Sequence, residues 1–150
     1  MSQSLAKILV HIVVSTKNHR PFLDIGIRPE LYAYLAGILK ANDSHVIKIG
    51  GTENHTHIFC ILPKGISLAK MIEEFKTSSS KWVKTKVPQY ASFYWQNGYG
   101  AFSVSQSDTE RVVKYIETQE EHHRKTSFEE EFRTFLEKYQ VPYDERYVWD

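Results

Sequence analysis

The stretch His55-Thr56-His57-Ile58-Phe59-Cys60-Ile61-Leu62 decides the fold and holds the most informative pair of residues in the chain. Five apolar residues follow the second histidine without interruption, which is typical of a buried strand. Side chains alternate between the two faces of a strand, so His55 and His57 point the same way, roughly 6 to 7 Å apart. Two imidazoles on one face form half of a metal site. Alone, such a pair is more often hydrogen-bonded or exposed, so further donors are needed.

The residues before this stretch predict two strands and a helix. Leu5 to Val14 is rich in isoleucine, valine and leucine and predicts a central strand. Pro29 suits the first turn of a helix that runs to about Ala41, because leucines and isoleucines recur there at helical spacing. His45 to Gly50 predicts another strand, and the turn at Gly51 to Asn54 joins it to the histidine strand as an antiparallel hairpin.

The residues after the stretch predict a long helix, a closing strand and two more helices. Ser67 is a candidate N-cap, and apolar residues then recur at steps of three and four through Val83. Tyr99 to Ser105 predicts the closing strand. Ser107 and Glu110 have the spacing of a capping box, which predicts a third helix through about His123. A fourth helix is expected over Phe128 to Tyr139.

This order of elements is that of a split βαβ unit. It predicts a ferredoxin-like α+β fold, with helices on one face of an antiparallel sheet, followed by C-terminal helices. A chain of 150 residues suits one domain, 1–150. The histidine strand precedes the second helix and is therefore expected at the centre of the sheet, where a metal would rest on a rigid platform.

The composition limits the function only weakly. Lys and Arg number 19 against 18 Asp and Glu, a net charge of +1 that does not by itself predict nucleic-acid binding. The charge is uneven, because lysines dominate from His45 to Tyr99 and glutamates follow Glu117. The single Cys60 excludes an internal disulfide and a cysteine-rich zinc site. No apolar run approaches the roughly 20 residues of a membrane span, so we expect a soluble cytoplasmic protein.

The third predicted helix offers the missing donor. Tyr115 and Gln119 are four residues apart, so they share one face of a continuous helix. If that face packs over the histidine strand, the Gln119 amide oxygen can bind the metal and Tyr115 can present its hydroxyl beside it. An arbitrary pair with this spacing is usually a half-buried aromatic and a solvated glutamine. Only the combination with the two histidines is specific.

That combination resembles the metal and nucleophile residues of the single-tyrosine HUH transposases of bacterial and archaeal insertion sequences. The resemblance covers nearly the whole chain. Thr56 departs from the family, which usually has a bulky hydrophobic residue between the two histidines. Further similar segments are Phe75–Trp82, Trp95–Val104, Gln119–Arg124 and Tyr143–Tyr147.

The resemblance implies metal-dependent cleavage and rejoining of single-stranded DNA at the ends of an insertion sequence. It implies that Tyr115 forms a 5′-phosphotyrosine and that His55, His57 and Gln119 bind Mg²⁺ or Mn²⁺. Such a transesterification keeps the bond energy in the intermediate, and the chain accordingly lacks a P-loop or GxGxxG nucleotide motif. Zinc is less favoured because the motif contains no cysteine or carboxylate ligand.

The resemblance also implies partners. They are single-stranded DNA with hairpin ends and a second copy of the chain, since the family's homodimers can place the tyrosine helix of one subunit over the histidines of the other. The polar face of the second helix suits phosphate contacts, although lysines are normal on any solvated helix face. The residues expected to contact DNA are Lys70, Lys76, Ser79, Lys81 and Lys84.

Several alternatives stay open at this point. His11, His19, His122 and His123 are rival ligands, and the last two are expected at the surface or on phosphates. A second function is a non-catalytic or domesticated module of the same fold that binds repeat hairpins. A third is a metal-dependent enzyme acting on a small molecule, in which Tyr115 would be incidental. The sequence identifies neither the hairpin nor the cleavage site.

Overall fold

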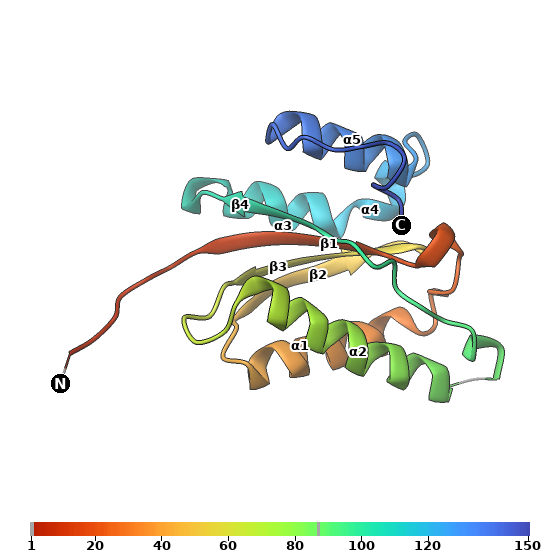
Figure 1. The fold of residues 1–150 in the computed structure, drawn as a ribbon, viewed down its shortest axis with the longest axis horizontal. Helices are drawn as coiled ribbons and strands as arrows, with labels where there is room; N and C mark the ends of the chain where they lie inside the picture. Colours follow the sequence, from red (N-terminus) through yellow and green to blue (C-terminus); the bar gives the residue numbers. More distant parts are fainter. Residues whose placement is uncertain (1, 87) are drawn as a thin grey trace.

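The computed structural model describes residues 2–86 and 88–150, and an antiparallel four-stranded sheet lies at its centre (Figure 1). The order across the sheet is β2-β3-β1-β4, so the histidine strand β3 is central, as predicted. The strands are β1 (Leu9–Ser15), β2 (Val46–Gly51), β3 (His55–Ile61) and β4 (Gly100–Val104).

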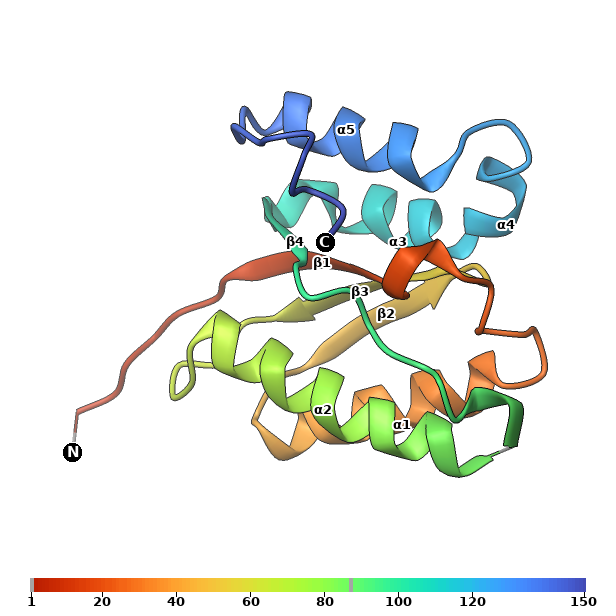
Figure 2. The same ribbon diagram turned by 45° about the vertical axis from the view of Figure 1, so that its right-hand side comes forward.

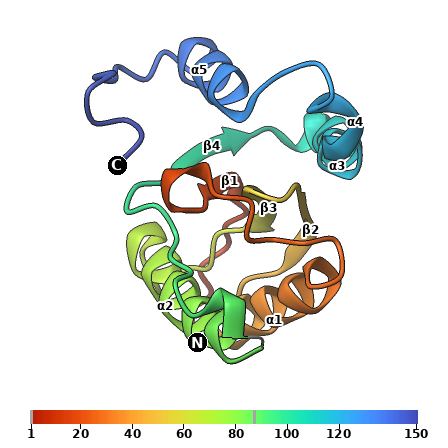
Figure 3. The ribbon, with the colours of Figure 1, turned by 90° about the vertical axis from the view of Figure 1, so that its right-hand side faces the viewer.

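Helices cover both faces of the sheet. Helices α1 (Arg28–Ala41) and α2 (Leu68–Lys86) lie on one face, and three C-terminal helices lie on the other, as Figure 2 and the end-on view in Figure 3 show. The latter are α3 (Thr109–Glu117), α4 (Gln119–His122) and α5 (Phe128–Lys138), while short 3₁₀ turns occupy Lys17–His19, Pro88–Tyr90 and Gln106–Asp108. The ferredoxin-like α+β prediction, with added C-terminal helices, is confirmed.

Side chains along the central strands alternate strictly between the two faces of the sheet, so one face is apolar and the other carries the two histidines. On β3, Ile58 and Cys60 join the apolar core beneath α1 and α2, whereas Phe59 packs against the opposite helices. His55 and His57 share the face of Phe59, because residues two apart in a strand point the same way. On β1, Leu9 and Val13 also pack toward this face. The histidines therefore look toward α3, α4 and α5.

The N-terminal strand is shorter than predicted. It begins at Leu9, where the backbone finds partners on both sides, at Ile61 of β3 and Val104 of β4. Leu5 has no such partners and is 86% exposed. The apolar residues before Leu9 led the sequence prediction to start the strand too early. A strand begins where its neighbours provide backbone partners, and composition does not show that. The hairpin of β2 and β3 is confirmed, as is the N-cap at Ser67, whose Oγ accepts from the Lys70 amide at 3.1 Å.

The predicted third helix is two helices. The backbone leaves the helical region at Thr118 (φ −101°, ψ 21°), which ends α3 and precedes α4. The capping box is also wrong, because Asp108 is the N-cap of α3 and makes no side-chain capping bond. Ser107 instead contacts the hydroxyl of Ser105. Tyr115 and Gln119 therefore belong to different helices.

Within the part of the chain that the structure describes, no helix has both the length and the apolar character needed to cross a bilayer.

Candidate functional site

His55 and His57 are fully buried side by side on β3, with ring centroids 5.1 Å apart. Their Nδ1 atoms are held by neighbours. Nδ1 of His55 lies 2.8 Å from Oδ1 of Asn54, and Nδ1 of His57 lies 2.7 Å from Nε2 of His11. To bind a metal, each ring would carry its hydrogen on Nδ1 and keep the lone pair on Nε2. In the metal-free protein Nε2 carries a hydrogen instead, because its neighbours, Gln119 Oε1 and Glu131 Oε1, are acceptors. Both Nε2 atoms face the C-terminal helices.

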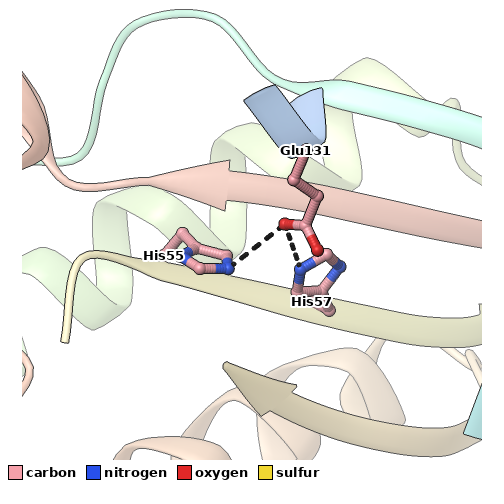
Figure 4. Close-up of side chains that lie close together, drawn as sticks. All are labelled: His55, His57 and Glu131. Carbon is pink, nitrogen blue, oxygen red and sulfur yellow. Dashed lines mark hydrogen bonds and ion pairs between the residues drawn. The ribbon is translucent and has the colours of Figure 1, made fainter. Parts of the chain in front are cut away.

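The carboxylate of Glu131 points between these two rings from α5 (Figure 4). Its Oε1 lies 3.1 Å from Nε2 of His57 and 3.4 Å from Nε2 of His55, and the residue is only 3% exposed. Helix α5 buries Phe128, Phe132 and Leu136, which anchor it over the sheet. Glu131 lies one turn after Phe128, so the same packing directs its side chain inward.

Gln119 closes the site from α4 and is 1% exposed. Its Nε2 donates a 3.0 Å hydrogen bond to Oε2 of Glu131. This bond fixes the orientation of the amide, because only the NH₂ group can donate to a carboxylate. Gln119 Oε1 consequently faces Nε2 of His55, at 2.9 Å.

These four side chains fit a divalent cation. Nε2 of both histidines, Oε1 of Gln119 and Oε1 of Glu131 converge as electron-pair donors. Three of the six separations among these atoms are 2.9 Å (His55 to Gln119), 3.1 Å (His57 to Glu131) and 3.4 Å (His55 to Glu131). Neighbouring ligands at bond lengths of about 2.1 Å in an octahedral shell lie about 3 Å apart. Because Glu131 supplies a carboxylate, the sequence argument that disfavoured zinc no longer holds.

Tyr115 reaches the same carboxylate from α3. Its hydroxyl donates a hydrogen bond to Oε2 of Glu131, and its ring centroid lies 5.8 Å from that of His57. Burial, and then the charge of Glu131, raise the pKa of Tyr115 well above its usual value. The hydroxyl is therefore protonated at neutral pH in the metal-free protein, and it lies next to the candidate metal ligands.

The protonation states suit a cation. Burial lowers the pKa of His55 to about 4 and that of His11 to about 3. Burial opposes the charge on Glu131, but hydrogen bonds from His123, His55 and His57 outweigh it and hold the pKa of that carboxyl far below its usual range. A neutral imidazole and an ionised carboxylate are the forms that bind metals.

The prediction that His122 and His123 lie at the surface is wrong for His123. Its side chain is 11% exposed, and its Nε2 lies 3.1 Å from Oε1 of Glu131. His122 is 36% exposed, with Nε2 at 3.6 Å from Oε2 of the same carboxylate. The two histidines and Glu131 form a second group with metal-ligand spacing. His122 is the last residue of α4 and His123 is its C-cap, so the end of this short helix brings both close to Glu131 of α5.

Sequence reasoning missed Glu131, although one signal was present. The helix prediction placed Phe132, Phe135 and Leu136 on one apolar face, and Glu131 lies within that face, four residues before Phe135. A carboxylate on the buried face of a helix is rarely left without a cationic, hydrogen-bonding or metal partner. Glu129 and Glu130 precede Glu131, so the three consecutive glutamates resemble the exposed acidic first turn that is common in helices.

The residues expected to contact DNA lie on α2, on the face of the sheet opposite α3, α4 and α5 (Figure 2). Ser79 is fully buried, and its Oγ donates to the carbonyl of Phe75 and accepts from Nε1 of Trp95. The expectation of a phosphate contact there is therefore wrong, because the hydroxyl is inside the core.

Lys76 also differs from a free surface lysine. Its ammonium donates to the carbonyls of Gln96, Asn97 and Gly98 at 2.7, 3.2 and 2.7 Å. Burial lowers the pKa of Lys76 to about 8. Lys70 and Lys81 are exposed, and Lys84 lies 3.7 Å from the centroid of the Tyr94 ring.

Two solved structures share this fold at low sequence identity. One is a protein assigned as a transposase from Deinococcus radiodurans R1, with 18% identity, a TM-score of 0.62, and coverage of 79% of this chain and 98% of that one. The other is a REP-associated tyrosine transposase bound to a REP hairpin, with 17% identity, a TM-score of 0.60, and coverage of 82% and 74%. A search of curated proteins gives no match.

A family model gives the decisive comparison. The model described as "Transposase IS200 like" matches residues 4–119, a segment that includes His55, His57, Tyr115 and Gln119. Glu131 lies beyond the matched segment. Because this match extends over more than half of the chain, the chain belongs to the IS200-like transposase family.

Proposed function

We propose that the protein is a single-tyrosine transposase that cleaves and rejoins single-stranded DNA with a divalent metal. His55, His57, Gln119 and Glu131 would bind the metal, and Tyr115 would be the nucleophile. One observation carries the proposal. The carboxylate of Glu131 lies within 3.4 Å of Nε2 of both histidines through one oxygen and accepts the Tyr115 hydroxyl through the other.

In the proposed reaction the Tyr115 oxygen attacks a DNA phosphorus, forming the phosphotyrosine bond and breaking the bond between phosphorus and the 3′ oxygen. The phenolic proton passes, in net terms, to the departing oxygen, so a 5′-phosphotyrosine and a free 3′-hydroxyl result. Attack by that hydroxyl, or by the 3′-hydroxyl of another strand, reverses the step and rejoins DNA. A bound Mg²⁺ or Mn²⁺ would supply positive charge that polarises the scissile phosphate.

The chain's own residues would position these groups. Glu131 holds the hydroxyl of Tyr115, while Asn54 and His11 hold the imidazoles of His55 and His57 by their Nδ1 atoms. Fixing the nucleophile and the ligands before substrate binds reduces the entropy lost in reaching the transition state. Loss of a contact to the nitrogen of a histidine ligand that does not bind the metal typically lowers metal affinity or activity 10- to 100-fold.

We also propose that one subunit supplies the whole site. Tyr115, Glu131 and His57 of a single chain are in mutual contact, so the geometry does not require a tyrosine helix from a partner. A homodimer with exchanged helices remains the sequence-based alternative. Mixing the Tyr115→Phe and His57→Ala variants distinguishes them. Exchange would restore activity in the mixture, whereas a site complete in each chain would leave the mixture inactive.

The substrate we propose is single-stranded DNA that carries a hairpin. The structural relative solved with a REP hairpin supports this choice, as does the lysine-rich segment between residues 45 and 99. The DNA that flanks the coding sequence should contain imperfect palindromes, which provide the test substrate.

The direct experiment is to incubate the protein with labelled palindromic single strands and Mn²⁺, and to look for a protein–DNA adduct that survives denaturation. Tyr115→Phe should abolish the adduct, whereas Tyr99→Phe, which alters a tyrosine outside the site, should not. Absence of any adduct together with tight hairpin binding would favour a non-catalytic binding module. An adduct that persists in Tyr115→Phe would show that another residue is the nucleophile.

A further inference from the structure

A cavity of about 350 Å³ opens beside Tyr115, between α3 and α5. Its deepest lining residues are buried, among them His11 and Glu131, which are 2% and 3% exposed. Its other lining residues include Arg111 and Lys138, which are exposed to solvent. The cavity therefore extends from a cationic opening to the hydroxyl of the proposed nucleophile.

The size and walls of the cavity restrict its occupant. A volume of about 350 Å³ is near the lower end for small-molecule sites, so the cavity suits one small planar group and excludes a duplex. Phe135 of α5 and Tyr139, the C-cap residue of that helix, form an aromatic wall. The Phe135 ring centroid lies 5.8 Å from that of Tyr115 and 5.2 Å from that of His11, both edge to face. Bases removed from a stack bind in aromatic surroundings of this kind.

The charges at the opening are complementary to a phosphodiester. Among residues 2–86 and 88–150 no carboxylate pairs with Lys138, whose ammonium lies 5.5 Å from the centroid of the Tyr139 ring. A phosphate therefore does not have to displace a carboxylate from this ammonium. Arg111 has one acidic neighbour, Asp108, at 3.7 Å, and its side chain is 80% exposed, a weak contact that a phosphate can replace. The carboxylate of Glu131 at the inner end is already engaged by His57, Gln119 and Tyr115.

We propose that this cavity binds one unpaired nucleotide of the DNA strand that Tyr115 attacks. The base packs against Phe135 and Tyr139, and the backbone phosphate lies between the cationic opening and the Tyr115 hydroxyl. This proposal rests on the proposed function and adds to it a binding site for part of the substrate. The rival location is the groove along α2 lined by Lys76, Tyr94 and Tyr99 on the other side of the sheet.

The test measures binding in the Tyr115→Phe protein with Mg²⁺, so that no covalent step interferes. A short fluorescent thymidine oligonucleotide is compared with an abasic oligonucleotide of the same length. Thr134, an exposed residue that lines the cavity, is changed to Trp to fill it, and Thr85→Trp on α2 is the matched control. Thr134→Trp should weaken thymidine binding about tenfold and abolish the preference for thymidine over abasic DNA.

Two further variants test the phosphate contact. Lys138→Ala should weaken both oligonucleotides equally and reduce the slope of log affinity against log salt by about one phosphate contact. Lys40→Ala, an exposed lysine on α1, should leave affinity and slope unchanged. A fall in affinity without a change in slope would count against a phosphate contact at Lys138.

A photocrosslinking experiment locates the base. An oligonucleotide with 5-iododeoxyuridine should crosslink to a peptide that contains Phe135 or Tyr139. Crosslinks at Tyr94 or Tyr99, or an unchanged base preference in Thr134→Trp, would overturn the proposal. Such a result would leave the proposed function intact if the unsubstituted protein still forms a covalent adduct. Absence of that adduct, by contrast, would contradict the proposed function whatever the oligonucleotides do.

Discussion

The Tyr115 hydroxyl and the Glu131 carboxylate are hydrogen-bonded across two helices, although the residues are 16 positions apart in sequence. The other oxygen of the same carboxylate lies 3.1 Å from Nε2 of His57. Glu131 therefore connects the proposed nucleophile to the proposed metal ligands through a single rigid group. Helix α5, which lies outside the segment matched by the family model, therefore contributes a residue to the site.

Replacing Glu131 by Gln should weaken Mn²⁺ binding at least tenfold, because the charged ligand is lost while the side chain keeps its size. Isothermal titration calorimetry measures the affinity. Glu130→Gln is the matched control, since Glu130 is the adjacent, exposed residue of the same helix. Loss of a group that only hydrogen-bonds to a metal ligand typically weakens metal binding 10- to 100-fold. Loss of a ligand itself should therefore weaken it by more than tenfold.

Thermal unfolding separates a ligand role from a structural one for Glu131. A structural role would lower the melting temperature in EDTA but preserve the increment that Mn²⁺ adds. A ligand role should remove most of that increment. If Glu131→Gln and Glu130→Gln bind Mn²⁺ equally well, the assignment of Glu131 as a ligand is wrong.

The metal-free protein should lose stability as the pH falls from 6.5 to 5. Burial lowers the pKa of His55 to about 4 and of His11 to about 3, whereas both are near 6.5 when unfolded. The unfolded chain thus binds more protons in this window, and the free energy of unfolding should fall by about 3 kcal/mol for the two groups together. The pKa of His123 is raised, so the stability that it contributes is lost only above this window.

Urea unfolding in EDTA at the two pH values checks this prediction. His11→Phe removes one of the two imidazoles whose pKa is lowered and keeps an aromatic ring, so the stability of this variant should depend less on pH. Equal or greater stability at pH 5 in the unsubstituted protein would contradict the buried, neutral state of these histidines.

Gly50→Ala should disturb the tyrosine helix through packing alone. A Cβ at Gly50 would lie 2.8 Å from both Cγ2 and the carbonyl oxygen of Ile116, the residue after Tyr115. Overpacking of this kind destabilises proteins by about 1–3 kcal/mol. A displacement of about 1 Å at a nucleophile can slow a reaction about 100-fold, so adduct formation should fall steeply.

Gly37→Ala is the control for that substitution. Gly37 is an exposed residue inside α1 with no atom within 4 Å of an added Cβ, so alanine should stabilise the protein by about 0.5–1 kcal/mol. Adduct formation should not change. Urea unfolding and the rate of adduct formation are measured for both variants. If Gly50→Ala has the same stability and adduct rate as Gly37→Ala, the added Cβ at Gly50 does not disturb the tyrosine helix.

The sheet was predictable from sequence because its signals are local. The apolar run after His57 and the polar turn at Gly51 to Asn54 are sufficient for a hairpin with a buried strand. The break at Thr118 was not predictable in this way. It divides α3 from α4 without a glycine or proline, and helical periodicity continues across it, so only the packing of α4 near β2 and of Gln119 against His55 reveals it.

The site was predictable in part for a similar reason. His55 and His57 lie on one strand, so spacing alone places them together, and Gln119, the third donor expected from the sequence, lies beside His55. Glu131 lies on the apolar face of α5, which indicates that it is buried, but its contact with His55 and His57 depends on how α5 packs over the sheet. His11 was considered only as a rival ligand, whereas the register of β1 and β3 makes it a neighbour of Nδ1 of His57.

The central claim is that Tyr115 bonds covalently to DNA in a site assembled around Glu131. The most direct measurement is to form the adduct with Mn²⁺ and a palindromic single strand, digest the DNA and protein, and identify the nucleotide-bearing peptide by mass spectrometry. We expect a 5′-linked nucleotide phosphate on Tyr115. Attachment at any other residue, such as Tyr99, would contradict it.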